Sequence, residues 1–76
     1  MSNTTSNPSL ARVIEAARHR AGLTKFKLAV RSGLSLTTVR LAEQGLATTR
    51  TLTAMSRALG VDVDELAGRK PLPVAR

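Results

Sequence analysis

The sequence predicts an all-α protein, a compact bundle of five short helices around one aliphatic core. Apolar residues recur at helical spacing, each helical run follows a capping residue, and each run is closed by a glycine. No stretch alternates between apolar and polar residues as a half-buried strand would. With 76 residues and a single phenylalanine as its only aromatic residue, the chain fits one domain with a core of Leu, Val, Ile and Ala.

The first helix is predicted to begin at Asn7-Pro8, because Asn is a favoured cap and Pro is tolerated at the first helical position. Gly22 is expected to end it in a left-handed conformation. Residues 1–7 are polar and are predicted to form a flexible tail. The apolar stripe of this helix consists of Leu10, Val13, Ile14, Ala17 and Ala21.

Four more helices follow the same pattern of cap and terminal glycine. The second is predicted from Lys25 to Arg31 or Ser32 after Thr24, and the third from Leu36 to about Gln44 after Ser35. The fourth spans about Thr49 to Leu59 after Thr48, and the fifth about Val63 to Ala67 after Asp62. These boundaries predict a domain over residues 8–68 and, because two prolines interrupt it, an irregular tail over residues 69–76.

Charge is the strongest signal in the composition. Twelve Lys and Arg against five Asp and Glu give a formal net charge of +7, which favours a polyanionic partner, nucleic acid first and an acidic membrane second. Between residues 16 and 61 the only acidic residue is Glu43. We therefore expect the polyanion to meet the middle of the chain.

Several classes of protein are disfavoured. The absence of cysteine excludes a disulfide framework and a Cys-based zinc site, and His19 is the only histidine, so no metal and no cofactor are expected. No catalytic residues and no enzyme are predicted. No apolar run approaches the ~20 residues that span a bilayer, and the first residues lack the pattern of a signal peptide. The prediction is a cytoplasmic, nucleoid-associated protein that does not bind membranes.

The stretch from Leu23 to Gly45 has the layout of a helix-turn-helix, two short helices joined by a tight turn. Gly33 fits the turn because positive φ costs glycine little. Ala29 is small where the two helices should cross closely. The apolar contact between the helices is predicted to consist of Leu28, Leu34 and Val39.

Over about Leu10 to Leu66, the sequence resembles the lambda-repressor/Cro-like helix-turn-helix family, also called the xenobiotic-response-element family. The resemblance is carried by the run RAGLTKFKLAVRSGLSLTTVRLAEQG and by TLTAMSRALGVDVDEL. Its most specific elements are Gly-Leu-Thr before the second helix, Leu-Ala within it, Gly-Leu-Ser in the turn, Glu43-x-Gly45, and Ala58-Leu59-Gly60-Val61 with Glu65-Leu66.

This resemblance implies that the third helix lies in the DNA major groove as the recognition helix. Leu36, Thr37 and Leu41 match positions that reach base edges, and Thr38 and Arg40 flank them. Leu36 and Leu41 replace the polar residues usual in the family, and a leucine can touch a thymine methyl but cannot form a bidentate hydrogen bond. Residues expected to meet DNA phosphates are Thr24, Lys25, Lys27, Ser35, Thr48 and Arg50. Each basic residue of the second helix could equally serve only solubility.

The resemblance further implies a structural ion pair between Arg18 and Glu43. It also implies a homodimer on a palindromic site, formed through Val61, Val63 and Leu66 together with Leu72 and Val74 of the tail. The sequence thus predicts a sequence-selective regulator that binds double-stranded DNA, repressor-like and from a bacterium or phage. The alternative is a protein-interaction module on the same scaffold, such as an antitoxin or a small protein docking on a host factor. It rests on Phe26 and Val30, which are apolar where the family has exposed polar residues.

Overall fold

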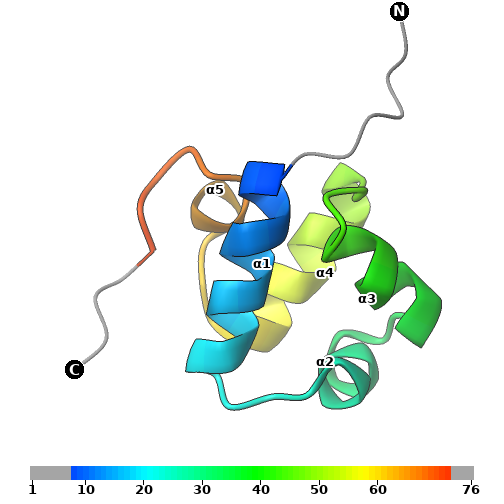
Figure 1. Cartoon of the computed structure of the whole chain (residues 1–76). Helices are drawn as coiled ribbons and strands as arrows, with labels where there is room; N and C mark the ends of the chain where they lie inside the picture. The colour runs from blue at the N-terminus through cyan, green and yellow to red at the C-terminus, as the bar shows by residue number, and fades with distance from the viewer. Residues whose placement is uncertain (1–7, 73–76) are drawn as a thin grey trace, which may run out of the picture.

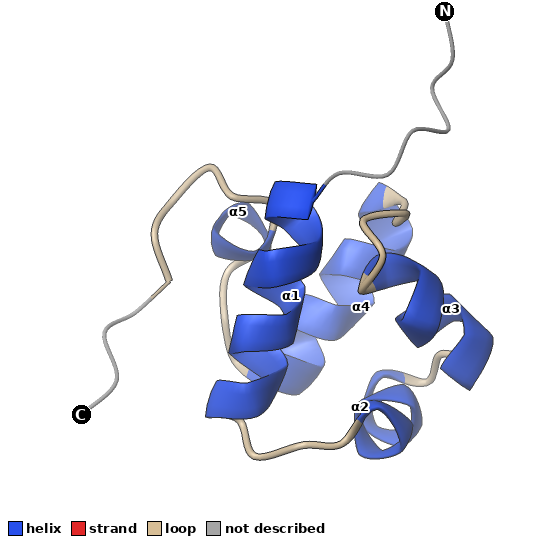
Figure 2. Ribbon diagram, in the orientation of Figure 1, coloured by secondary structure: helices blue, strands red, loops and turns tan. Residues whose placement is uncertain are grey.

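The computed structural model describes residues 8–72 and contains, within that range, five helices and no strand (Figures 1 and 2). The all-helical fold class predicted from the sequence is therefore confirmed. The residues expected to form the N-terminal tail and the cap Asn7 lie outside the described range. The helices are α1 (Pro8–Arg20), α2 (Lys25–Ser32), α3 (Leu36–Ala42), α4 (Thr49–Leu59) and α5 (Val63–Leu66).

Two helices end earlier than the sequence predicted: α3 ends at Ala42 instead of near Gln44, and α5 ends at Leu66 instead of Ala67. The reason for α3 is a change of hydrogen bonding in its last turn. There the Gln44 N–H donates to the Leu41 carbonyl at 3.0 Å and the Gly45 N–H to the Ala42 carbonyl at 2.9 Å. These i to i−3 bonds tighten the backbone before the chain leaves the helix.

The turn between α2 and α3 depends on the left-handed backbone of Gly33, whose φ is 73°. The Gly33 N–H donates to the Val30 carbonyl at 3.3 Å, and the Leu34 N–H donates to the Ala29 carbonyl at 3.0 Å. This pair of bonds is a Schellman motif, which satisfies carbonyls at the end of α2 while the chain reverses. Ser35 then caps α3, so the whole change of direction takes three residues.

The helices pack so that α2 and α3 lie together on the side of the molecule away from α5 (Figure 1). α4 contacts both α2 and α5, and α1 contacts α3 and α5. The core between them contains the predicted contact residues Leu28, Ala29 and Val39, with Leu34 packed against it. The buried apolar residues are Ile14, Ala17, Leu23, Leu28, Ala29, Val39, Ala42, Leu52, Met55 and Leu66.

Two sequence-based assignments of apolar residues are wrong. Ala21 is exposed, because α1 ends at Arg20 and the chain turns away before the stripe continues. Leu66, expected at a dimer interface, is fully buried in the core of its own chain. Val61, Val63 and Leu72 are partly buried against the same core, so Leu72 packs on the domain although it lies in the predicted tail. Val74 lies outside the described residues.

Among the described residues, no helix combines the length and the apolar character that crossing a bilayer requires.

We expect Gly33→Ala to lower the free energy of unfolding by about 1 kcal/mol, the cost of placing an L-residue in the left-handed region. A Cβ at this position would have no other heavy atom within 4 Å, so the loss is conformational and not steric. Gly33→Asn is the matched control and should lose less, because Asn tolerates this region better. Urea unfolding followed by circular dichroism measures both; equal losses would contradict the conformational explanation.

Candidate nucleic-acid interface

The outward face of α3 contains three of the five residues that the sequence proposes as base readers. Thr37, Arg40 and Leu41 are exposed, while Leu36 is half-buried. The opposite face of α3 is closed by the buried side chains of Val39 and Ala42. Successive residues of a helix are rotated by about 100°, so Thr37 and Leu41 share one strip of the outward face and Arg40 lies beside them.

Thr38, the remaining proposed base reader, is turned toward the start of its own helix. Its backbone N–H donates to Ser35 Oγ at 3.0 Å, and the two hydroxyl oxygens lie 2.9 Å apart in a further hydrogen bond. Thr38 is half-buried. Its hydroxyl therefore supports the cap of α3 and is less free than the side chains of Thr37 and Arg40.

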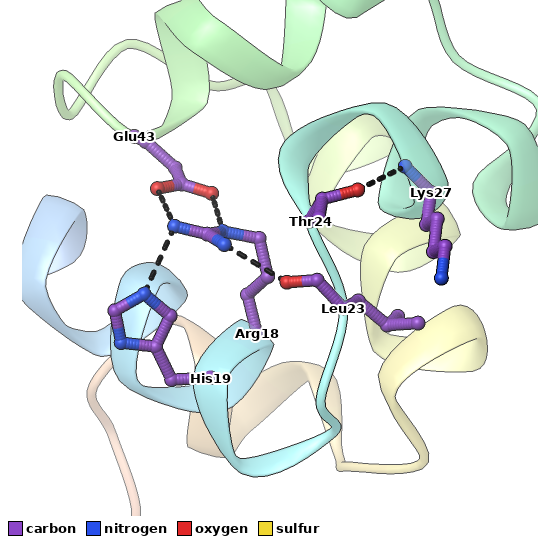
Figure 3. Close-up of polar contacts among 6 residues, drawn as sticks. All are labelled: Arg18, His19, Leu23, Thr24, Lys27 and Glu43. Carbon is purple, nitrogen blue, oxygen red and sulfur yellow. Dashed lines mark hydrogen bonds and ion pairs between the residues drawn. The ribbon is translucent and has the colours of Figure 1, made fainter.

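The hydroxyls proposed to meet phosphates are the N-caps of three helices. Thr24 Oγ1 accepts from the Lys27 N–H at 3.1 Å at the start of α2 (Figure 3). At the start of α4, Thr48 Oγ1 accepts from the Thr51 N–H at 3.2 Å and donates its own proton to Thr51 Oγ1 at 3.2 Å. Within residues 8–72, the Thr24 hydroxyl proton has no acceptor, so Thr24 is better placed than Thr48 to donate to a phosphate.

The basic side chains divide into two groups. Near the C-terminal end, Arg69 pairs with Asp64 at 2.9 Å and Lys70 pairs with Asp62 at 2.6 Å. The hydrogen bond from Lys70 to the Asp62 carboxylate, together with its negative charge, raises the pKa of Lys70 above its usual value. These two cations are thus largely neutralised by neighbouring acids.

The other cations are not compensated in this way. Within the described residues, the only remaining ion pair is that of Arg18 with Glu43. α2, α3 and the start of α4 therefore present basic side chains without an acidic partner, and all of them are exposed. These are Lys25, Lys27, Arg31, Arg40 and Arg50.

Arg18 and Glu43, the pair implied by the family resemblance, are in contact between α1 and the end of α3. Arg18 Nε lies 2.5 Å from Glu43 Oε2, and a second guanidinium nitrogen lies 3.2 Å from Oε1 (Figure 3). Their side chains are only 9% and 5% exposed. Such a bidentate pair is geometrically specific, so it fixes the end of α3 against α1.

Two further partners of Arg18 were not predicted from the sequence. Its guanidinium donates to the Leu23 carbonyl at 2.9 Å, and it lies 3.2 Å from His19 Nε2 (Figure 3). The sequence carries no signal for the first contact, because a backbone carbonyl is available at every position. Through it, Arg18 also holds the loop that leads into α2.

Phe26 and Val30 are each 65% exposed on α2, and Leu41 is 41% exposed on α3. Phe26 and Val30 are four residues apart and form one flank of α2, while Lys27 and Arg31 form the other. These three are the exposed large apolar side chains of the described part of the chain. The exposed large apolar side chains thus lie on the same two helices as four of the uncompensated cations, Lys25, Lys27, Arg31 and Arg40.

No group of three or more His, Asp or Glu side chains that could hold a metal occurs within residues 8–72.

Comparison with known proteins gives one family match. A family model described as a helix-turn-helix domain matches residues 9–68, which covers all five helices except the first residue of α1. No curated protein matches the sequence.

We expect Glu43→Ala to lower the free energy of unfolding by about 3 kcal/mol, because the buried Arg18 guanidinium would lose its counter-ion. Glu15→Ala is the matched control. It removes the same charge from an exposed position, and its effect should stay within about 0.5 kcal/mol.

A second variant, Arg18→Met with Glu43→Leu, should lose less stability than Glu43→Ala, because no unpaired charge remains buried. Urea unfolding of the three variants and the parent protein measures these differences. Equal stability of the Glu43→Ala and Glu15→Ala variants would show that the buried ion pair does not hold α3 to α1.

Proposed function

Because the chain belongs to the helix-turn-helix domain family, we propose that it is a sequence-selective regulator that binds double-stranded DNA. In this proposal α3 enters the major groove with Thr37, Arg40 and Leu41 toward the base edges. The observation that carries the proposal is the position of these exposed side chains beside basic residues that have no acidic partner. The protein acts by occupying a DNA site and carries out no chemistry.

Affinity in this mode comes from neutralising phosphates. Lys25 and Lys27 on α2 and Arg50 at the start of α4 are exposed on helices that adjoin the turn or pack against α2. Each phosphate contact releases a counter-ion, so the logarithm of the binding constant falls with the logarithm of salt concentration by about 0.9 per contact. Thr24 adds a hydroxyl donor at the start of α2.

The proposal extends to a repressor-like protein of the lambda-repressor/Cro-like type, from a bacterium or phage. The support is the set of motifs shared with that family, from Gly22-Leu23-Thr24 to Glu65-Leu66. A single small domain covers little DNA, so a homodimer on a palindromic site is part of the proposal. Leu66 is excluded from its interface by burial; the partly buried Val61, Val63 and Leu72 are the remaining described candidates.

The test is a fluorescence-anisotropy titration of a random duplex pool at several salt concentrations, followed by sequencing of the bound fraction. Salt-dependent binding and enrichment of a short palindrome are expected. An absence of DNA binding even at low salt would overturn the proposal.

Lys25→Ala and Arg50→Ala should each weaken binding to all duplexes similarly and reduce the salt slope by about 0.9. Arg57→Ala is the matched control, since it removes the same charge from an exposed position near the far end of α4. Anisotropy at four or more salt concentrations gives the slopes. If the Arg57 variant lost as much slope as the other two, the effect would be one of net charge and not of contact.

A second candidate function is a protein-interaction module on the same scaffold, such as an antitoxin. The observation that favours it is the exposure of Phe26 and Val30, two large apolar side chains on one flank of α2. Large apolar groups that adjoin each other on a surface are typical of binding sites for other proteins.

The double variant Phe26→Ala/Val30→Ala separates the two functions. Because both side chains are exposed, its free energy of unfolding should stay within about 0.5 kcal/mol of the parent protein. Under the regulator proposal it keeps its DNA affinity, measured by anisotropy. Under the alternative its DNA affinity is also unchanged, but it loses a protein partner that the parent protein retains in a pull-down. The pull-down is therefore the measurement that separates the two functions.

A further inference from the structure

The outward face of α3 offers few hydrogen-bonding groups to a DNA base. α3 has three hydrogen-bonding side chains, Thr37, Thr38 and Arg40, and Thr38 is tied to Ser35 through its hydroxyl. Within residues 8–72, Thr37 and Arg40 are the exposed side chains of α3 whose polar atoms have no partner. One hydroxyl and one guanidinium therefore remain for reading base edges by hydrogen bonds.

Leu41 occupies the same outward strip as Thr37, four residues along the helix. Its side chain is 41% exposed, in contrast to the buried neighbours Val39 and Ala42. Its carbonyl accepts hydrogen bonds from the Gln44 N–H at 3.0 Å and the Leu46 N–H at 2.9 Å. The backbone that carries this leucine is thus fixed by the structure of the helix end.

A leucine on this strip selects for a particular chemical group in the major groove. The base edges there present hydrogen-bond donors and acceptors at every pair, and the 5-methyl group of thymine is the apolar exception. A base without that methyl leaves the leucine against water or against polar atoms that it cannot satisfy. 5-Methylcytosine carries the same methyl group at the same ring position.

We propose that Leu41, with Thr37 beside it on the same strip, makes the 5-methyl group of a pyrimidine the main sequence determinant of the DNA site. This inference rests on the proposed function, since it requires that α3 lies in the major groove. Arg40 supplies the hydrogen-bonding part of the readout, for which guanine is the matching base. The expected site therefore combines thymines, or methylated cytosines, with guanine.

The experiment uses the duplex that is enriched in the random-pool selection, made in three forms. One form contains thymine, one contains uracil at every thymine position, and one contains uracil together with 5-methylcytosine in place of cytosine. Uracil lacks only the methyl group of thymine, so base pairing is kept. We expect the uracil form to bind about fourfold more weakly for each methyl group contacted, from the burial of one methyl-sized group.

The third form distinguishes the two sources of the methyl group. If the uracil form binds more weakly than the thymine form, the site reads the methyl group of thymine. If the thymine and uracil forms bind alike and the form with 5-methylcytosine binds more tightly, the site reads methylated cytosine. Both results support readout of a 5-methylpyrimidine. Equal binding of the thymine, uracil and methylcytosine forms overturns it while leaving sequence-selective binding intact.

Leu41→Ala should bring the ratio of thymine to uracil affinities close to one and leave the salt slope unchanged. Val30→Ala is the matched control, an exposed apolar residue on α2, and should keep the ratio of the parent protein. If the selection enriches no duplex, sequence-selective binding itself fails, and the methyl readout fails with it. The comparison of uracil with thymine in the parent protein needs no variant, so the test does not depend on the folding of Leu41→Ala.

Discussion

The position of the outward face of α3 depends on one buried charge, the guanidinium of Arg18. A buried cation is tolerated only when it is paired and hydrogen-bonded, and Arg18 draws its partners from different parts of the chain. Glu43 follows the last residue of α3, and the Leu23 carbonyl lies in the loop that leads into α2. Because one planar group must satisfy both, the end of α3, the start of α2 and the side of α1 are fixed together. Apolar packing alone is non-directional and would not set this register.

Hydroxyl side chains cap the starts of α2, α3 and α4, and this restricts the hydrogen-bonding groups left on the surface. Ser35 with Thr38, and Thr48 with Thr51, form the same arrangement: a capping oxygen accepts the N–H three residues on, and the two hydroxyls bond to each other. The second hydroxyl stabilises the cap, but it is then no longer freely available to a ligand. A sequence rich in Thr and Ser around α3 and α4 therefore has fewer groups for DNA than its composition suggests.

Much of the fold could be predicted from local signals, since cap, apolar period and glycine agree along the chain. α2 and α4 have the predicted bounds, and Gly33 has the predicted left-handed backbone. The wrong predictions concern either the ends of helices or contacts between residues that are far apart in the sequence. The family resemblance places Leu66 at a dimer interface, and only the packing of α5 against α1 and α4 shows that it is buried. Likewise, a hydroxyl can be recognised as a cap from sequence, but whether its proton is free depends on a neighbouring rotamer.

In the proposed complex, the exposed cations contribute to the affinity for DNA, and the exposed side chains of α3 contribute to its sequence specificity. Exposed cations act over roughly the Debye length of about 8 Å at physiological salt, and they attract a phosphate backbone whatever its sequence. Apolar and hydrogen-bonding contacts act only at contact distance, and in the proposed complex α3 supplies those through the exposed Thr37, Arg40 and Leu41. Glu43 fixes the end of α3 to the body of the protein, so the proposed complex does not require α3 to be repositioned. A chain with few hydrogen-bond donors on its reading face can thus still be selective, provided that the face is rigid and that its apolar part meets a complementary group.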